Sequence, residues 1–320
     1  MLVLRTRSIA TPRSVRVVST SPLPIDLAAQ LPGTRVELPA RWAGIAGLDL
    51  GDADALVCLL LDHVDAAVLA RAPRLRVVAN CAVGYDNVDV AAATAAGIAV
   101  TNTPDVLTEA TAEFTWALIL AAARRLPEGA ALVRSGTWPG WRLDQLLGMG
   151  LAGKTLGIVG PGRIGRAVAR RADAFGMRVI SVGRGGDVDA LFAAADVVSL
   201  HCPLTPETHH LVNAARLARM KPTAIVVNTA RGGCVDEGAL IEAFARGQIA
   251  GAALDVFEGE PRVDPRLRAD PRLVLAPHLG SATTEARTAM AQLCADAVTA
   301  VLSGRRPANL VNPDVVLRRG

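Results

Sequence analysis

The feature that most constrains the fold of this chain is an apolar run that ends in a glycine-rich turn. The run Thr155–Val159 leads into Gly160-Pro161-Gly162-Arg163-Ile164-Gly165, and apolar residues at helical spacing continue to Gly176. This pattern predicts strand, turn and helix, the context in which G-x-G-x-x-G is informative. The glycines permit a tight turn, close approach of a pyrophosphate and close helix–strand packing, and the helix start attracts negative charge. The pattern therefore predicts a dinucleotide-binding unit.

Short apolar runs alternate with helical patterns on both sides of this turn, which is typical of α/β folds with parallel sheets. We expect two doubly wound parallel-sheet domains with a cleft between them. A flavodoxin-like substrate domain would comprise residues 1–101 plus 285–320, and an inserted Rossmann nucleotide-binding domain residues 102–284. Besides Thr155–Val159, the predicted strands are Val15–Ser19, Ala55–Leu61, Leu75–Ala79, Ile98–Thr101, Arg178–Val182, Val197–Leu200, Ala224–Asn228, Gly251–Leu254 and Leu273–Ala276.

A long segment rich in alanine and leucine, Pro104–Arg125, is predicted to be a helix with Pro104 in its first turn. Because it is too apolar to be exposed on a monomer, we expect it to be buried between domains or against a second subunit. Trp138 and Trp141 follow in a loop rich in glycine and proline, where they could close an active site or anchor the loop.

Composition excludes several classes of protein. Half of the 320 residues are apolar, but no unbroken apolar stretch reaches the roughly 18 residues of a membrane span. The net charge is +4, its arginines are dispersed and only 3% of residues are aromatic, which argues against nucleic-acid binding. Five dispersed cysteines without C-x-x-C spacing argue against structural zinc and for a reducing compartment. We expect a cytoplasmic protein with no metal, membrane or nucleic-acid partner.

Three charged or titratable residues follow successive predicted strands. Arg231, Glu260 and His278 come after the strands that end at Asn228, Leu254 and Ala276. Taken singly, each has a simpler explanation: a surface cation, a loop acid and a residue at a helix entry. Because ligands of open parallel sheets bind beyond the carboxyl ends of the strands, their joint placement predicts a site at that edge.

These residues lie within motifs that resemble a known family. The motifs are Ala79–Asp89, Thr101–Thr108, the glycine turn, Asn228–Gly232, Asp255–Pro261 and Pro277–Thr283. Together they are similar to those of the D-2-hydroxyacid dehydrogenases, and within that family to the glyoxylate/hydroxypyruvate reductases. The resemblance implies two similar α/β domains, a nicotinamide cofactor, a small 2-oxo or 2-hydroxy acid substrate and a homodimer.

The resemblance also implies a role for individual residues. His278 would be the acid/base, Glu260 its partner and Arg231 the anchor of the substrate. Histidine titrates near neutrality and arginine presents a planar fork that matches a carboxylate, which suits these roles. The substrate would also contact Leu60 and the backbone N–H groups of Val83 and Gly84. Besides the glycine turn, the cofactor would contact Thr108, Gly183, Arg184, Cys202, Pro203, Thr229, Ala230, Arg231, Asp255, His278 and Gly280.

The choice of cofactor depends on the residues after the strand Arg178–Val182. An acidic residue there normally binds the ribose of NAD, whereas this chain has Gly183-Arg184-Gly185. Arg184 favours the 2′-phosphate of NADP(H). Asp187 follows closely, however, and a short connection could bring it to the ribose of NAD(H).

The predicted substrate is small and carries no phosphate, because leucines and Asp62, rather than basic residues, lie at the end of the predicted strand Ala55–Leu61. Glyoxylate or hydroxypyruvate fits best. The alternatives are a broad 2-ketoacid or D-lactate-type dehydrogenase, and a nucleotide-sensing corepressor that uses the same scaffold without catalysis.

Overall fold

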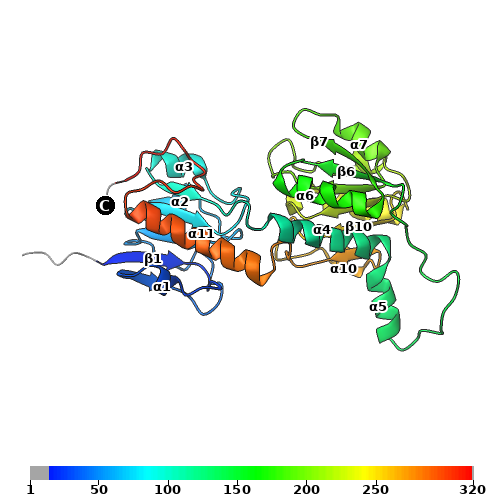
Figure 1. Cartoon of the computed structure of the whole chain (residues 1–320), viewed down its shortest axis with the longest axis horizontal. Helices are drawn as coiled ribbons and strands as arrows, with labels where there is room; N and C mark the ends of the chain where they lie inside the picture. Colours follow the sequence, from blue (N-terminus) through cyan, green and yellow to red (C-terminus); the bar gives the residue numbers. More distant parts are fainter. Residues whose placement is uncertain (1–13, 319–320) are drawn as a thin grey trace, which may run out of the picture. The chain divides into compact units, whose positions relative to one another are not determined.

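Parallel strand pairing organises this protein into two separate sheets. The computed structural model describes residues 14–318, and these divide into a first unit, residues 14–104 with 288–318, and a second unit, residues 105–287 (Figure 1). The chain passes from one unit to the other between residues 104 and 105 and again between residues 287 and 288. The predicted boundaries, 101/102 and 284/285, each lie three residues before the observed ones.

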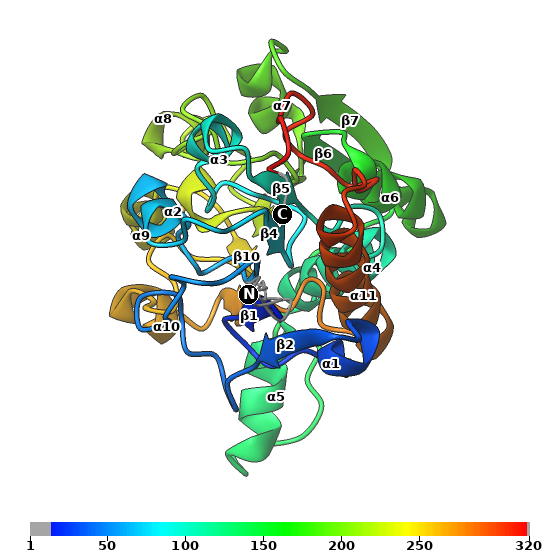
Figure 2. The ribbon, with the colours of Figure 1, turned by 90° about the vertical axis from the view of Figure 1, so that its left-hand side faces the viewer.

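The sheet of the first unit has the strand order β2-β1-β3-β4-β5, with every neighbouring pair parallel. Helices α1 and α11 pack on one face and α2 and α3 on the other, which leaves two apolar layers around the sheet (Figure 2). The elements are β1 Val15–Ser19, α1 Leu27–Gln30, β2 Thr34–Glu37, β3 Ala55–Cys58, α2 Ala66–Ala70, β4 Val77–Asn80, α3 Val90–Ala95, β5 Ala99–Thr101 and α11 Thr284–Leu302.

The sheet of the second unit has the order β11-β10-β9-β8-β6-β7 and is also parallel throughout. Helices α4 and α6 cover one face, and α7 to α10 cover the other (Figure 1). The elements are α4 Thr108–Ala123, α5 Leu126–Arg134, β6 Thr155–Val159, α6 Arg163–Ala172, β7 Arg178–Val182, α7 Val188–Ala194, β8 Val197–Leu200, α8 Ala214–Leu217, β9 Ile225–Asn228, α9 Glu237–Ala245, β10 Gly251–Leu254, α10 Pro265–Ala269 and β11 Leu273–Leu275, with short 3₁₀ turns at Asp173–Phe175 and Gly232–Cys234.

The strand order determines where a ligand can bind. The chain leaves β6 for β7 on one side and then returns to β8 on the other, so the order switches at β6. Ligands of open α/β sheets bind at such a switch point, beyond the carboxyl ends of the strands. The glycine turn and the three predicted catalytic residues all follow strands of this sheet at that edge.

The predicted strands agree with the structure where an apolar run is long and bounded by turn residues. The strands β1, β6, β7, β8 and β10 have the predicted bounds. The strand predicted to reach Leu61 ends at Cys58, because the amide of Leu59 turns to donate to the Asp62 carboxylate. Strand β2 was not predicted, since its sequence Thr-Arg-Val-Glu lies half-exposed at the sheet edge.

The long apolar helix requires two corrections. Helix α4 begins at Thr108 rather than at Pro104, because Asp105 adopts the left-handed conformation with φ 70°. Its apolar face is buried within its own unit, against α6, β9 and β10. Trp116 shows this packing: its Nε1 donates to the carbonyl of Val168 at 3.0 Å and its ring stacks on Phe175. The apolar composition of α4 is therefore explained by burial within its own unit. The predicted burial between domains or against a second subunit is not needed to account for it.

None of the helices within residues 14–318 combines the length and the apolar character that crossing a membrane requires.

Candidate active site

The glycine turn has the geometry that binding a pyrophosphate requires. Gly160 has φ 88°, and a Cβ there would lie 2.7 Å from the amide nitrogen of Cys202. A Cβ at Gly165 would lie 2.4 Å from the carbonyl oxygen of Gly160, so this glycine allows α6 to approach the strand. A Cβ at Gly162, in contrast, would meet nothing within 4 Å. The space in front of Gly162 is the open side of the turn, where a phosphate can approach the backbone.

The start of helix α6 adds donors to this turn. Gly162 is its N-cap and, among the described residues, no side chain caps its first amides. These N–H groups and the helix dipole favour an anion. Arg163, the first residue of α6, forms an ion pair of 2.6 Å with Asp105, which precedes α4. The pair ties the start of α4, where Thr108 lies, to the glycine turn.

A cavity of about 570 Å³ adjoins the glycine turn within the second unit. Five residues predicted to bind the cofactor line it, together with residues that the sequence analysis did not single out. The predicted ones are Gly160, Gly183, Arg184, Cys202 and Pro203; the others include Thr205, Glu207, Thr208 and Leu211. The glycine turn, the open space in front of Gly162 and this cavity fit the phosphates and one nucleoside of a dinucleotide.

The structure separates the two side chains on which cofactor choice depends. Arg184 lines the cavity beside Gly160. Asp187 is the N-cap of α7, where its Oδ1 accepts from the amide of Ala190 at 2.9 Å. It lines a different depression, on the side of Ile180 and Ala194. Its carboxylate therefore caps helix α7 and does not line the cavity beside Gly160.

His278 and Glu260 form a hydrogen-bonded pair. The Nδ1 of His278 lies 2.9 Å from the Oε2 of Glu260, and both side chains are half-buried. The other oxygen of Glu260 accepts from the amide of Phe257, which fixes the carboxylate on its own loop. Burial raises the pKa of Glu260, but the contacts with His278, Phe257 and Arg231 outweigh it and hold this pKa below the ordinary value. Glu260 is therefore an anion that orients the imidazole through its bond to Nδ1.

Arg231 is brought to this pair by a close contact between two loops. Its loop follows β9, and Asn228 holds it by accepting from Ala230 and donating to the carbonyl of Arg231. A Cβ at Gly232 would lie 1.9 Å from the carbonyl carbon of Phe257. Only a glycine lets the loop of Arg231 lie directly on the loop of Glu260.

Asp255 organises the segment that carries His278. The two carboxylate oxygens of Asp255 accept from the amides of Leu279 and Gly280 at 2.6 and 2.8 Å. The amide of His278 donates to the Asp255 carbonyl, and His278 has φ 55°, a conformation that costs a non-glycine residue energy. Asp255 is buried, and burial raises its pKa despite the two donors. Asp255 thus holds the segment after β11 in place, and its contact with nicotinamide stays a prediction.

The remaining predicted residue of this sheet edge is Thr229, whose hydroxyl lies 3.0 Å from that of Thr115 in α4.

In the first unit, the predicted substrate amides lie in the loop after β4. Asn80 donates to the carbonyl of Gly84, and Asn102 donates to the carbonyl of Val83, both at 2.8 Å. These bonds fix the two peptide groups, while neither N–H finds an acceptor among residues 14–318. Consecutive free amides form an anion-binding nest, which suits a carboxylate. Leu60 lies half-buried in the turn after β3.

Comparison with known proteins decides the family. The model of the D-isomer specific 2-hydroxyacid dehydrogenase NAD-binding domain matches residues 116–280. The glyoxylate reductases of Thermococcus litoralis and Aeropyrum pernix are 50% and 52% identical over 282 and 284 residues, which are 83% of this chain and 85% and 84% of theirs. This chain belongs to the D-isomer specific 2-hydroxyacid dehydrogenases.

A solved structure of another member agrees with this assignment. The NADPH-dependent glyoxylate/hydroxypyruvate reductase of Sinorhizobium meliloti, in complex with NADP and malonate, is 34% identical with a TM-score of 0.84. The match covers 96% of this chain and 99% of that one. The resemblance inferred from the motifs is confirmed, as are the two parallel-sheet α/β domains.

Two residues that support this dehydrogenase site were not singled out from the sequence. Asn228 lies inside a quoted motif, but its hydrogen bonds to residues 230 and 231 become visible only in the folded loop. Gly232 lies in the same motif, and the reason for glycine there is a contact with a loop that follows a different strand. The glycine next to Arg231 was the available signal, and its position in the sequence alone did not show which loop it contacts.

Proposed function

We propose that this dehydrogenase reduces glyoxylate or hydroxypyruvate to the 2-hydroxy acid with NADPH, and that His278 is the acid/base. The observation that carries the proposal is the hydrogen-bonded pair of His278 and Glu260, with Arg231 on the adjoining loop, at the edge where the glycine turn lies. The named relatives, glyoxylate reductases at about half identity, support the substrate class.

Each group has a defined task in this reaction. A bound nicotinamide would supply the hydride. Because Nδ1 of His278 is bonded to Glu260, Nε2 is the nitrogen that gives a proton to the carbonyl oxygen. Glu260 holds the imidazole in position through its bond to Nδ1. Arg231 binds the substrate carboxylate and polarises the carbonyl, and the amides of Val83 and Gly84 also bind that carboxylate.

A substrate panel tests this proposal. Purified protein is assayed for NADPH oxidation with glyoxylate, hydroxypyruvate, pyruvate and longer 2-oxo acids. We expect the highest kcat/KM with glyoxylate or hydroxypyruvate. A preference for pyruvate or longer acids would favour the broad 2-ketoacid alternative, and tight NADPH binding without turnover would favour the sensor.

NADPH is the proposed cofactor because Arg184, and not Asp187, lines the cavity beside the glycine turn. The variant Arg184→Ala removes a charged partner of the 2′-phosphate. We expect the KM for NADPH to rise about 10- to 100-fold, as the loss of a hydrogen bond to a charged group predicts. The KM for NADH should change little. Steady-state kinetics with both cofactors measures this.

Asp187→Asn is the matched control. Asparagine is as good an N-cap as aspartate, so the fold should be retained. We expect an unchanged ratio of NADPH to NADH efficiency. A selective loss of NADH use in Asp187→Asn, with no effect of Arg184→Ala, would show that Asp187 binds the ribose and that the proposed preference is wrong.

We also propose that the protein is a homodimer located in the cytoplasm. The segment from α5 to residue 147 exposes large apolar side chains within one stretch of chain. They are Leu126, Val133, Trp138, Trp141, Leu143 and Leu147, each at least half exposed. Such a patch is typical of an interaction surface. A role of Trp138 and Trp141 as anchors at this surface is preferred to closure of an active site.

A further inference from the structure

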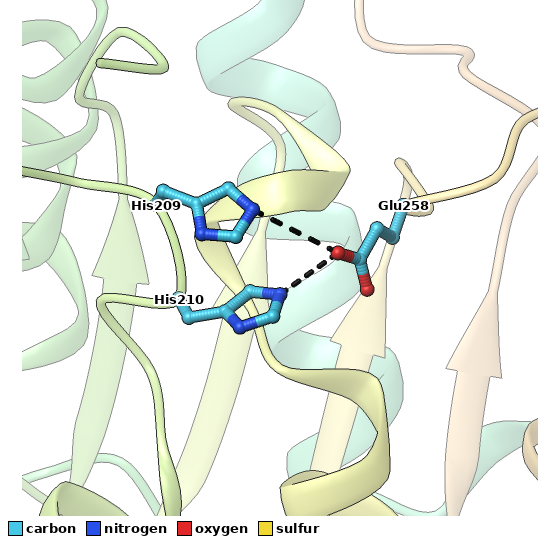
Figure 3. A group of neighbouring side chains, drawn as sticks. All are labelled: His209, His210 and Glu258. Carbon is cyan, nitrogen blue, oxygen red and sulfur yellow. Dashed lines mark hydrogen bonds and ion pairs between the residues drawn. The ribbon is translucent and has the colours of Figure 1, made fainter. Parts of the chain in front are cut away.

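A group of ligand-type side chains lies outside the residues assigned to catalysis. His209 and His210, in the loop after β8, face Glu258, in the loop after β10 (Figure 3). The Oε1 of Glu258 lies 2.8 Å from Nε2 of His210 and 3.9 Å from Nε2 of His209. Each residue offers one ligand atom, and the three atoms lie within 4.8 Å of one another.

The backbone holds these side chains in place. His210 has φ 48°, and its amide donates to the carbonyl of Gly233 while its own carbonyl accepts from Asn213. The two imidazole rings stack with centroids 4.0 Å apart, so both Nε2 atoms point toward the same carboxylate (Figure 3). On the opposite side, the amide of Glu258 donates to Glu237 at 2.9 Å. The side chains of His209 and His210 therefore lie on the same side of the chain, although the two residues are consecutive in sequence.

The donor set matches a borderline transition metal. Two imidazoles and one carboxylate with an open fourth position suit Zn²⁺, Co²⁺ or Ni²⁺. Bonds of about 2.0–2.2 Å in a tetrahedron place ligand atoms about 3.5 Å apart. The present separations of 2.8 and 3.9 Å from Glu258 bracket that value. Small side-chain rotations would complete the geometry.

The local charge also favours a cation. The carboxylate of Glu237 accepts from the amide of Glu258, and the same loop carries the carboxylate of Glu260. Further carboxylates therefore lie on or against the loop that carries Glu258. The dispersed cysteines that argued against structural zinc have no bearing here, because these ligands are nitrogen and oxygen.

We propose that His209, His210 and Glu258 form a binding site for one divalent transition-metal ion, with water as the fourth ligand. The ion would join two loops of the second unit. One carries Thr205, Glu207 and Thr208 of the cavity wall, and the other carries Glu260. Metal binding itself does not depend on the proposed reaction, so its test can fail or succeed independently of turnover.

Isothermal titration of tag-free, EDTA-treated protein with Zn²⁺ tests the site. We expect one equivalent to bind, and His210→Ala and Glu258→Gln each to weaken the affinity at least about tenfold, as loss of a ligand requires. His63→Ala, which removes an exposed histidine outside the cluster, should leave it unchanged. Thermal melting shows whether each variant is folded.

A Co²⁺ titration excludes the cysteines as the source of binding. We expect d–d absorption without thiolate-to-cobalt charge transfer, since the ligands are imidazole and carboxylate. Equal zinc affinity in the wild type, His210→Ala and Glu258→Gln would overturn the proposal, and so would charge-transfer absorption or the absence of any binding to the wild type.

Discussion

Histidine occurs five times in this chain, and the structure gives the imidazoles different surroundings. His278 was identified from its position after a strand, because parallel topology brings strand ends to one edge. His201 also follows a strand, yet its ring is buried and its Nε2 lies 2.9 Å from the hydroxyl of Ser199. Strand-end position alone therefore does not distinguish the candidate acid/base from His201. The hydrogen-bond partner that distinguishes it, Glu260, was placed beside it only by the family motif and the folded loops.

Replacement of Glu260 by glutamine tests the role of this carboxylate. Glutamine can still accept a hydrogen bond from Nδ1 of His278, but it carries no negative charge. We expect a lower kcat for reduction, because a hydrogen bond to a charged acceptor holds the imidazole more strongly than one to a neutral acceptor. Steady-state kinetics with glyoxylate and NADPH measures this. An unchanged kcat in the folded variant would show that the charge of Glu260 has no role in the reaction.

The pH dependence of stability provides a second test at this scale. Burial lowers the pKa of His201 from 6.5 to about 3. The unfolded chain then binds a proton that the folded chain rejects, so this group reduces stability as pH falls from about 6.5 to 3, by up to about 1.4 kcal/mol per pH unit. His201→Asn should flatten the dependence of unfolding free energy on pH between 6.5 and 5, above the range where carboxylates titrate. Urea unfolding at several pH values decides this.

At the scale of elements, loops rather than strands build the site. Apolar runs predicted most strands because burial on both faces requires such runs. Strand β2 and helix α5 were missed, since an edge strand and a helix without buried residues carry little apolar periodicity. The contact between the Arg231 and Glu260 loops was not predictable either, because it joins segments more than twenty residues apart through backbone atoms at Gly232.

Two alanine substitutions distinguish the effect of this loop contact on stability from an effect on cofactor binding. Gly232→Ala forces a Cβ into the backbone of Phe257, so we expect a loss of about 1–3 kcal/mol of stability and a large fall in kcat. Gly162→Ala places its Cβ in open space, so its stability should stay close to that of the wild type while NADPH binding weakens. Thermal melts and fluorescence titration with NADPH measure both effects. The same behaviour in both variants would contradict these assignments.

At the scale of the whole molecule, the two units repeat one topology. Counted along the chain, the first sheet has the order 2-1-3-4-5, and the second repeats it with a sixth strand added. The alternation of strand and helix patterns predicted this class. The crossing at 287/288 lies inside helix α11, and the crossing at 104/105 lies in the short segment between β5 and α4, so neither is marked by a long linker.

The proposed homodimer is tested by the apolar segment that follows α4. We expect the wild type to have twice the monomer mass by light scattering, and Leu143→Glu combined with Leu147→Glu to reduce it toward the monomer. Val316→Glu is the control, because Val316 is 83% exposed and Leu143 is 81% exposed, but Val316 lies outside this segment. A wild-type monomer, or a dimer unaffected by the double variant, would refute this assignment.

The most direct test of the proposed reaction is glyoxylate-dependent NADPH oxidation by the wild type and His278→Ala, with NADPH affinity measured in parallel. Proton transfer by a positioned side chain contributes about 10²- to 10⁴-fold, so kcat should fall by that factor while the dissociation constant of NADPH stays within about twofold. An unchanged kcat in the folded variant would contradict the assignment of His278 as the acid/base.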